Sequence, residues 1–344
     1  MSRKLFIPPT PEELDASLPS YLVITMLSKD KRSACFYGMD EARNLPVVIK
    51  VFPKSLGADP SFLDAFNSQL EAIKQLSHDN LISVYEFGLV DEMPFVVTEY
   101  MEGNPLERST KGETIEPEQA VRIILGLAQG LAHAHERGIL HTDINPDKIF
   151  LNQDAKPFLT DFGYYEKVRV SKVQPDYGSS GYAARETLSG QIDQRADIYS
   201  LGVVFYELLT GGVPKLPYQA PSEQVSCGTH FDHFLVKALH PEAAQRHRSI
   251  TEFVTELSEI FNQSLVVSQP QVQPAISLMQ ATSSKTESAV YSEKPLLIGL
   301  ISAAVAAILV WMALIYVCNR STQEDLTSIV SHQSSARFDS EEKE

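Results

Sequence analysis

With 344 residues and a hydrophobic content of 43%, the chain is long enough for one two-lobed globular domain with additional segments. Its formal net charge of −15 argues against a nucleic-acid partner, because such partners normally require a basic face. The cysteines, Cys35, Cys227 and Cys318, lie far apart and match no metal-binding spacing, which predicts free thiols in a reducing compartment.

The first part of the sequence predicts a polar lead-in and a small lobe rich in β-strands. Residues 1–20 contain prolines and no long apolar run, so we expect a loose lead-in without a signal peptide. Strand-like runs follow, interrupted at residues 61–76 by apolar side chains at the spacing of a helix. The strand signals lie at residues 21–24, 34–37, 47–51, 81–87 and 95–99.

The next part predicts a helical lobe. A helix should begin at Glu116, with proline and acidic side chains in its first turn, and continue to Gly138. We expect His133 and His135 on this helix to be ordinary surface or packing histidines, because residues two apart on a helix do not face each other and cannot share a metal. A second, buried helix is expected after residue 193.

Between these helices lies the sequence His-Thr-Asp-Ile-Asn-Pro-Asp-Lys at residues 141–148, followed by Asp-Phe-Gly at residues 161–163. The two motifs resemble the catalytic loop and metal loop of the eukaryotic-type (Hanks-type) serine/threonine protein kinase family, H-R-D-L-K-P-x-N and D-F-G. The resemblance covers residues 21–261, over which characteristic residues occur in family order with family spacing. These residues are Lys50, His78, Asp143, Asp161, Glu186, Asp197 and Arg246.

The resemblance implies an α+β, two-lobed protein-kinase fold over residues 21–262, with ATP and Mg²⁺ as cofactors. In the family's mechanism Lys50 would pair with the phosphates, Asp143 would be the catalytic base and Asp161 the principal metal ligand. Asp197 would hold the backbone of the catalytic loop, and Arg246 would pair with Glu186. The resemblance also assigns residues to the nucleotide pocket, namely Val48, Glu99, Met101 and Phe150.

Several family positions hold other residues in this chain. The lid loop, residues 28–33, contains no glycine and includes Asp30, whose charge would face the phosphates. Gln69 occupies the position of the helix glutamate that pairs with the lysine. Thr142 replaces the arginine that reads a phosphate on the activation segment, so phospho-switching of that type is not expected.

The lysine and the asparagine of the family's catalytic loop are exchanged here, as Asn145 and Lys148. Because an ammonium cannot ligate a cation, Lys148 should exclude the second metal and leave one metal at Asp161. We favour a site that has lost its function, with Lys148 pointing to solvent. In the alternative, Lys148 supplies a fixed positive charge near the second metal position and Asn145 bonds to a phosphate oxygen.

These changes favour a membrane-anchored, pseudokinase-like binding and signalling module that binds ATP weakly. The alternative is an active, atypical serine/threonine kinase that transfers the γ-phosphate of ATP to protein serine or threonine. In either case the partners or substrates would be proteins, which the sequence does not identify.

The C-terminal part predicts a membrane anchor. Residues 263–295 form a linker rich in Ser, Gln and Pro, and residues 319–344 form a short acidic tail. Between them, residues 296–318 are uncharged and mostly apolar, which exceeds the ~20 residues needed to span a bilayer. Lysines on the N-terminal side of this segment predict a single-pass protein with its kinase-like domain in the cytoplasm.

Overall fold

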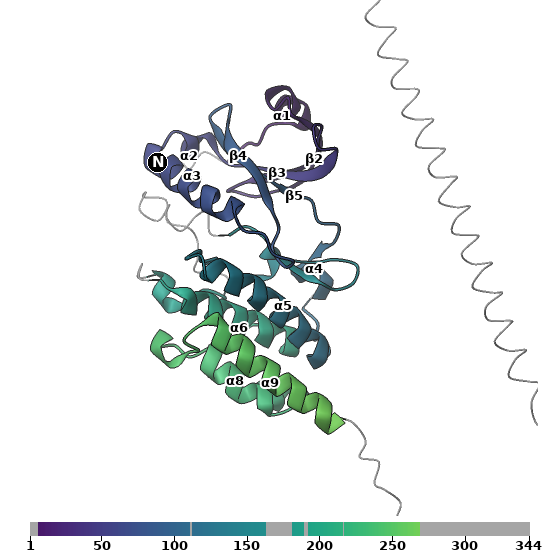
Figure 1. Ribbon diagram of the computed structural model, residues 1–344, viewed down its shortest axis with the longest axis vertical. Coiled ribbons are helices and arrows are strands. Elements are labelled where there is room, and N and C mark those ends of the chain that lie inside the picture. Colours follow the sequence, from purple (N-terminus) through teal and green to yellow (C-terminus); the bar gives the residue numbers. More distant parts are fainter. Residues whose placement is uncertain (1–5, 111, 163–180, 189–191, 216, 269–344) are drawn as a thin grey trace, which may run out of the picture. The chain divides into compact units, whose positions relative to one another are not determined.

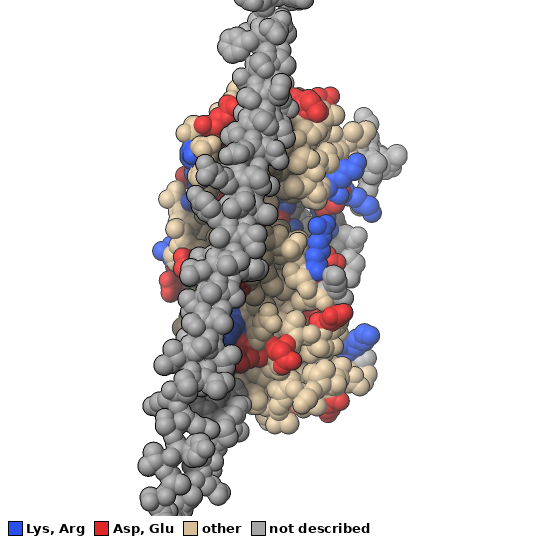
Figure 2. Space-filling view, turned by 90° about the vertical axis from the view of Figure 1, so that its right-hand side faces the viewer, with Lys and Arg blue, Asp and Glu red and all other residues tan. Residues whose placement is uncertain are grey.

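The structure is a computed structural model that describes residues 6–110, 112–162, 181–188, 192–215 and 217–268. All of these residues belong to one compact unit, Met1–Val272. A sheet-rich N-terminal lobe leads into a helical C-terminal lobe, which confirms the expected α+β, two-lobed arrangement (Figure 1). On the face that Figure 2 shows, acidic and basic side chains are interspersed over the described surface.

The N-terminal lobe is built on a five-stranded antiparallel sheet with the strand order β1-β2-β3-β5-β4. Strand β5, which lies between β3 and β4, is buried along nearly its whole length, which explains the continuous apolar run there. The register places Lys50 of β3 between Cys35 of β2 and Val96 of β5. The strands are β1 Tyr21–Lys29, β2 Ala34–Asp40, β3 Leu45–Val51, β4 Val84–Val90 and β5 Met93–Glu99.

Three helices accompany this sheet: α1 Pro11–Ser17, α2 Lys54–Gly57 and α3 Pro60–Lys74. Helix α3 confirms the helix predicted from the apolar periodicity of residues 61–76. Helix α1 corrects the expectation of a loose lead-in, because Thr10 and Glu13 form a reciprocal capping box and a proline occupies the first turn. Leu14 anchors α1 in an apolar cluster that it shares with β1, β2 and β3.

The C-terminal lobe consists of helices around α6, which is buried on almost every side. A second apolar cluster runs continuously from α3 through α5 and α6 to α9 and therefore joins the two lobes. A small sheet, in the order β6-β7-β8, carries the loop that contains the catalytic motif. The helices are α4 Leu106–Thr110, α5 Pro117–His135, α6 Gln194–Thr210, α7 Pro221–Gln224, α8 His230–Ala238 and α9 Ile250–Ser268, and the strands are β6 Asn104–Pro105, β7 Ile149–Leu151 and β8 Pro157–Leu159.

The predicted membrane anchor lies outside the described residues, as do the tail and nearly all of the linker. Among the helices that the structure describes, none is long and apolar enough to cross a membrane.

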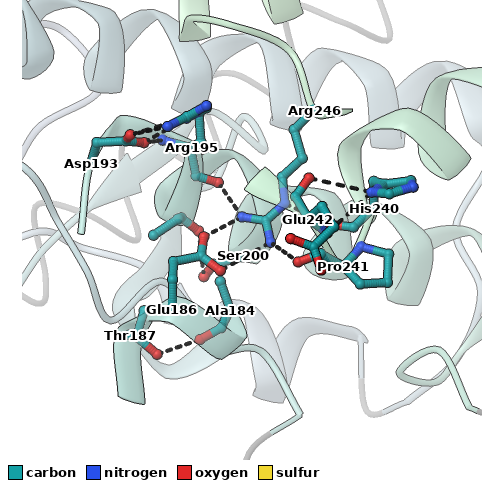
Figure 3. Close-up of polar contacts among 11 residues, drawn as sticks. Ala184, Glu186, Thr187, Asp193, Arg195, Ser200, His240, Pro241, Glu242 and Arg246 are labelled. Carbon is teal, nitrogen blue, oxygen red and sulfur yellow. Dashed lines mark hydrogen bonds and ion pairs between the residues drawn. The ribbon is translucent and has the colours of Figure 1, made fainter. Parts of the chain in front are cut away.

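Arg246 ties together three segments of the C-terminal lobe (Figure 3). Its buried guanidinium donates to both carboxylate oxygens of Glu186, at 2.5 and 3.1 Å, which confirms the predicted pair. It also donates to the backbone carbonyl oxygens of Arg195, His240 and Pro241. One side chain thus connects the turn that follows the activation segment, the start of α6 and the segment that precedes α9.

Replacing Arg246 with alanine should lower the thermal midpoint of the full chain by more than about 6 °C. Removing one partner of a buried ion pair lowers the free energy of unfolding by about 3–5 kcal/mol. Each kcal/mol lost lowers the thermal midpoint of a domain of this size by about 2–4 °C. Differential scanning fluorimetry measures the effect. The matched control is Arg248→Ala at an exposed position two residues along, which should change little. Equal midpoints for the two variants would contradict the anchoring role of Arg246.

Candidate functional site

A cavity of about 460 Å³ is lined by β1–β3, the segment after β5 and the catalytic loop. The end of β5 contributes Glu99 and the segment after it contributes Met101, and the preceding residue, Thr98, is buried and also lines the cavity. Asp143 and Asn145 are absent from the lining. The predicted residues that do line the cavity are Val48, Lys50, Glu99, Met101, Lys148, Phe150 and Asp161.

At the inner end of the cavity, two lysines share one carboxylate. The Nζ atom of Lys50 lies 2.5 Å from Oδ2 of Asp161, and the Nζ atom of Lys148 lies 2.8 Å from the same oxygen. All three side chains are largely buried, with exposed fractions of 9%, 21% and 15% for Lys50, Lys148 and Asp161. The interpretation in which Lys148 points to solvent is therefore wrong, because its ammonium group is bound inside the site.

The charges of this cluster stabilise one another. Burial by itself would raise the pKa of Asp161, but the ammonium groups of Lys148 and Lys50 outweigh burial and hold that pKa well below its usual range. Burial would likewise lower the pKa of Lys50, and the carboxylate of Asp161 raises it instead. The cluster therefore contains two ammonium groups and one carboxylate, and it carries a net positive charge.

Asp197, in the first turn of α6, binds the backbone of the catalytic loop. Its Oδ2 accepts the backbone N–H of His141 at 2.8 Å, and its Oδ1 accepts the backbone N–H of Thr142 at 2.6 Å. This confirms the role expected for Asp197. Thr142 has a φ of 66°, which is unusual for a β-branched residue. The buried hydrogen bond to Asp197 therefore stabilises a strained backbone conformation.

His135 has a more specific role than the surface or packing role expected from the sequence. Its Nε2 lies 2.8 Å from Oδ2 of Asp197, and its side chain is almost fully buried. The signal that could have found it is helical spacing, because His135 lies on the same face of α5 as the buried residues Ala128 and Leu131.

His141 joins the catalytic loop to the Asp-Phe-Gly motif. Its Nε2 donates to the carbonyl oxygen of Thr160 at 2.9 Å, and its Nδ1 accepts the backbone N–H of Asp143 at 3.3 Å. Burial lowers the pKa of His141, which agrees with the neutral ring that these two bonds require. The ring also packs against Phe162, at 4.7 Å between centroids. The positions of Asp143 and Asp161 are therefore coupled through one buried imidazole.

Asn145 contacts its own loop. Its side-chain amide donates to the carbonyl oxygen and to Oδ1 of Asp143, at 3.0 and 3.2 Å. Its Oδ1 accepts the backbone N–H of Asp147 and thereby caps the 3₁₀ turn Pro146–Lys148. Asn145 thus orients the carboxylate of Asp143 and fixes the turn that carries Lys148.

The lid loop between β1 and β2 binds its own aspartate. Oδ1 of Asp30 accepts the backbone N–H groups of Arg32 and Ser33, at 2.6 and 2.7 Å, and its own N–H donates to the carbonyl oxygen of Ser33. In a glycine-rich lid, such N–H groups lie close to the phosphates of the nucleotide. Here a carboxylate of the loop itself occupies two of them.

Two further residues can be located relative to the cavity. Gln69 is half-buried on α3, and no hydrogen bond joins it to Lys50 within the described residues. Cys35, which the sequence predicted only as a free thiol, lines the cavity opposite Lys50, and burial raises the pKa of its thiol. The central part of the activation segment, residues 163–180, lies outside the described residues.

The donor groups of the site do not match a magnesium site of the family type. Magnesium requires near-octahedral oxygen coordination, and kinases supply it with the Asp of the Asp-Phe-Gly motif and the asparagine of the catalytic loop. Here the Asp161 carboxylate already binds two ammonium groups, and position 148 provides one of these ammonium groups in place of an amide oxygen. The expectation of one metal at Asp161 is therefore at odds with this donor set.

Comparison with known proteins places the chain among protein kinases. A family model for the protein kinase domain matches residues 24–288. The serine/threonine-protein kinase PknL of Mycobacterium tuberculosis is 32% identical over 199 residues, which cover 56% of this chain and 50% of PknL. The serine/threonine-protein kinase PrkC of Bacillus subtilis is 29% identical over 199 residues, which cover 56% of this chain and 31% of PrkC. The chain thus spans half or less of the length of these curated relatives.

A solved structure shows the same fold. The kinase domain of Mycobacterium tuberculosis PknI superposes with a TM-score of 0.60 at 26% sequence identity. The superposition covers 70% of this chain and 96% of that domain. The similarity to this solved kinase domain therefore also confirms the two-lobed fold expected from the sequence.

Replacing Asp197 with alanine should destabilise the chain and loosen the catalytic loop. The N–H groups of His141 and Thr142 would lose their acceptor in a buried site, at a cost of about 1–3 kcal/mol for each group. Thermal unfolding measures the stability, and hydrogen exchange at residues 141 and 142 should become faster. The matched control is Asp193→Ala, which removes the exposed N-cap of the same helix and should cost about 1 kcal/mol without affecting exchange in the loop. Equal behaviour of the two variants would count against the anchoring role of Asp197.

Proposed function

Because the chain belongs to the Hanks-type serine/threonine protein kinase family, we propose that it is a kinase-like nucleotide-binding module with impaired phosphotransfer. Members of this family typically use ATP and Mg²⁺. The parts that favour nucleotide binding are the cavity and Lys50, which lies on β3 where the family's phosphate-pairing lysine lies. A module of this kind would act through protein partners, which it would bind or position.

The observation that carries the impaired phosphotransfer is the lid loop that binds its own aspartate, Asp30. Two of its backbone N–H groups donate to Asp30, so a phosphate would have to displace a carboxylate that is covalently part of the loop. The lid therefore contributes little to holding the transferring phosphate. Loss of positioning groups is costly for phosphoryl transfer, because catalysis there consists almost entirely of positioning and electrostatic stabilisation.

A second candidate function is an active, atypical serine/threonine kinase. The hydrogen bonds that fix the carboxylate of Asp143 and the backbone of its loop favour it. Asn145 orients its carboxylate, and the backbone of its loop is anchored on Asp197 through the two preceding residues. A catalytic base is useful only when it is positioned in this way. Incubation of the full chain with γ-labelled ATP and a basic protein substrate distinguishes the two functions. The binding module leaves both proteins unlabelled, whereas robust labelling would establish the active kinase.

Replacing Lys50 with alanine should abolish the thermal stabilisation that ATP gives to the full chain. Lys50 is the most deeply buried cation at the inner end of the cavity, and charge-assisted hydrogen bonds to phosphate are about twice as strong as neutral ones. The control is Lys54→Ala, an exposed lysine of the same lobe, which should keep the wild-type response. If ATP stabilises Lys50→Ala as much as the wild type, the assignment of the pocket is wrong.

We further propose that residues 296–318 anchor the protein in a membrane, with the kinase-like domain in the cytoplasm. The segment is uncharged and longer than the ~20 residues needed to cross a bilayer. Lys285 and Lys294 precede it and Arg320 follows it, a slight positive bias toward the side that carries the domain.

Protease added to intact cells or spheroplasts that express the full chain should therefore leave residues 1–290 uncut. Permeabilised cells are the control, in which the same protease should degrade the domain. Immunoblotting with an N-terminal tag reads the result. Digestion of the domain in unpermeabilised cells would refute the proposed topology.

A further inference from the structure

Lys148 lies at a position where the family places a metal ligand. It ends the 3₁₀ turn Pro146–Lys148, directly before β7. Its ammonium group contacts Oδ2 of Asp161 at 2.8 Å, and it lines the same cavity as Lys50. An ammonium group carries a fixed positive charge and only donor hydrogens, so it can bind a phosphate oxygen but cannot coordinate a cation.

The backbone around Lys148 is fixed from both sides. Its N–H donates to the carbonyl oxygen of Asn145, and its own carbonyl oxygen accepts the N–H of Thr160, each at 3.0 Å. Asn145 caps the turn, and β7 pairs with β8 immediately after it. The lysine therefore extends from a rigid frame, which reduces the conformational entropy lost when its ammonium group binds a ligand.

The charges at the inner end of the cavity suit an anion better than a metal complex. One of the two ammonium groups balances the carboxylate of Asp161, and the other remains available for a phosphate. A divalent cation at the same place would meet two positive charges and a single carboxylate. In the family, Mg²⁺ bridges the β- and γ-phosphates and neutralises their charge. Lys148 supplies positive charge at that location without any metal.

We infer that the pocket binds a nucleoside polyphosphate as the metal-free anion, with the ammonium group of Lys148 in the place of the divalent cation. This inference rests on the proposed function, namely that the pocket takes a nucleotide. It adds that Mg²⁺ does not assist binding and weakens it, because the magnesium complex carries less negative charge and the Asp161 carboxylate is already bound by two ammonium groups.

Isothermal titration calorimetry of the full chain with ATP tests this inference directly. One titration contains EDTA, and the other contains MgCl₂ in excess over ATP. The wild type should bind at least as tightly in EDTA as in Mg²⁺. A wild type that binds only with Mg²⁺ would overturn the inference and leave the proposed nucleotide binding intact. Absence of binding under both conditions would overturn the proposed function and, with it, the inference.

Lys148→Asn restores the family's amide oxygen and removes the charge. It should weaken binding in EDTA by about tenfold or more, the effect of losing one charge-assisted hydrogen bond, and Mg²⁺ should then restore part of the affinity. The matched control is Lys156→Asn, a lysine that lies outside the cavity and half-exposed beside Asp79. That control should bind as the wild type does. If Lys148→Asn is folded by circular dichroism and binds ATP in EDTA as tightly as the control, Lys148 does not replace the metal.

Discussion

The buried carboxylate of Asp197 is the interaction on which the candidate site depends. It belongs to α6, the most deeply buried helix of the described part of the chain, and it accepts hydrogen bonds from two consecutive residues of the catalytic loop. His135 brings a third contact to the same carboxylate from α5. Because these partners come from the core, the position of the loop follows from the packing of the helical lobe. The loop holds Asp143 and Lys148 in place. His141 links the loop to the residue before Asp161, because its ring bonds both to the backbone of Asp143 and to the carbonyl oxygen of Thr160.

The site keeps the framework of a kinase and replaces the groups that would contact the phosphates. The framework consists of Asp197, His141 and the ion pair of Arg246 with Glu186. The contacts of Asp197 and Arg246 are those that the resemblance implied. The phosphate contacts have changed in a consistent way. An aspartate occupies donors of the lid, and a lysine occupies the position of a metal ligand. The protein thus places its own charged side chains where a nucleotide and its metal would lie.

Much of the fold could be predicted from the sequence, because strand and helix periodicities and ordered motifs are local features. The lead-in helix α1 was missed, although Thr10 and Glu13 form a readable capping box. The direction of Lys148 could not be predicted, since an exchanged pair of residues looks the same in a sequence whether the side chain is bound or free. The role of Asp30 was also hidden. Its charge was evident, but its two hydrogen bonds from backbone N–H groups depend on the backbone conformation of the loop, which the sequence does not specify.

The self-capped lid has a consequence for how the protein can respond to a nucleotide. A ligand shifts a conformational equilibrium only as far as its affinity differs between the two states. A glycine-rich lid gains order when it closes on phosphates, so nucleotide occupancy and lid conformation are thermodynamically linked. In this chain Asp30, rather than a phosphate, orders the tip. We therefore expect the conformation of the lid to change little when a nucleotide binds. A conformational response to the nucleotide would then involve the catalytic loop and α6 instead.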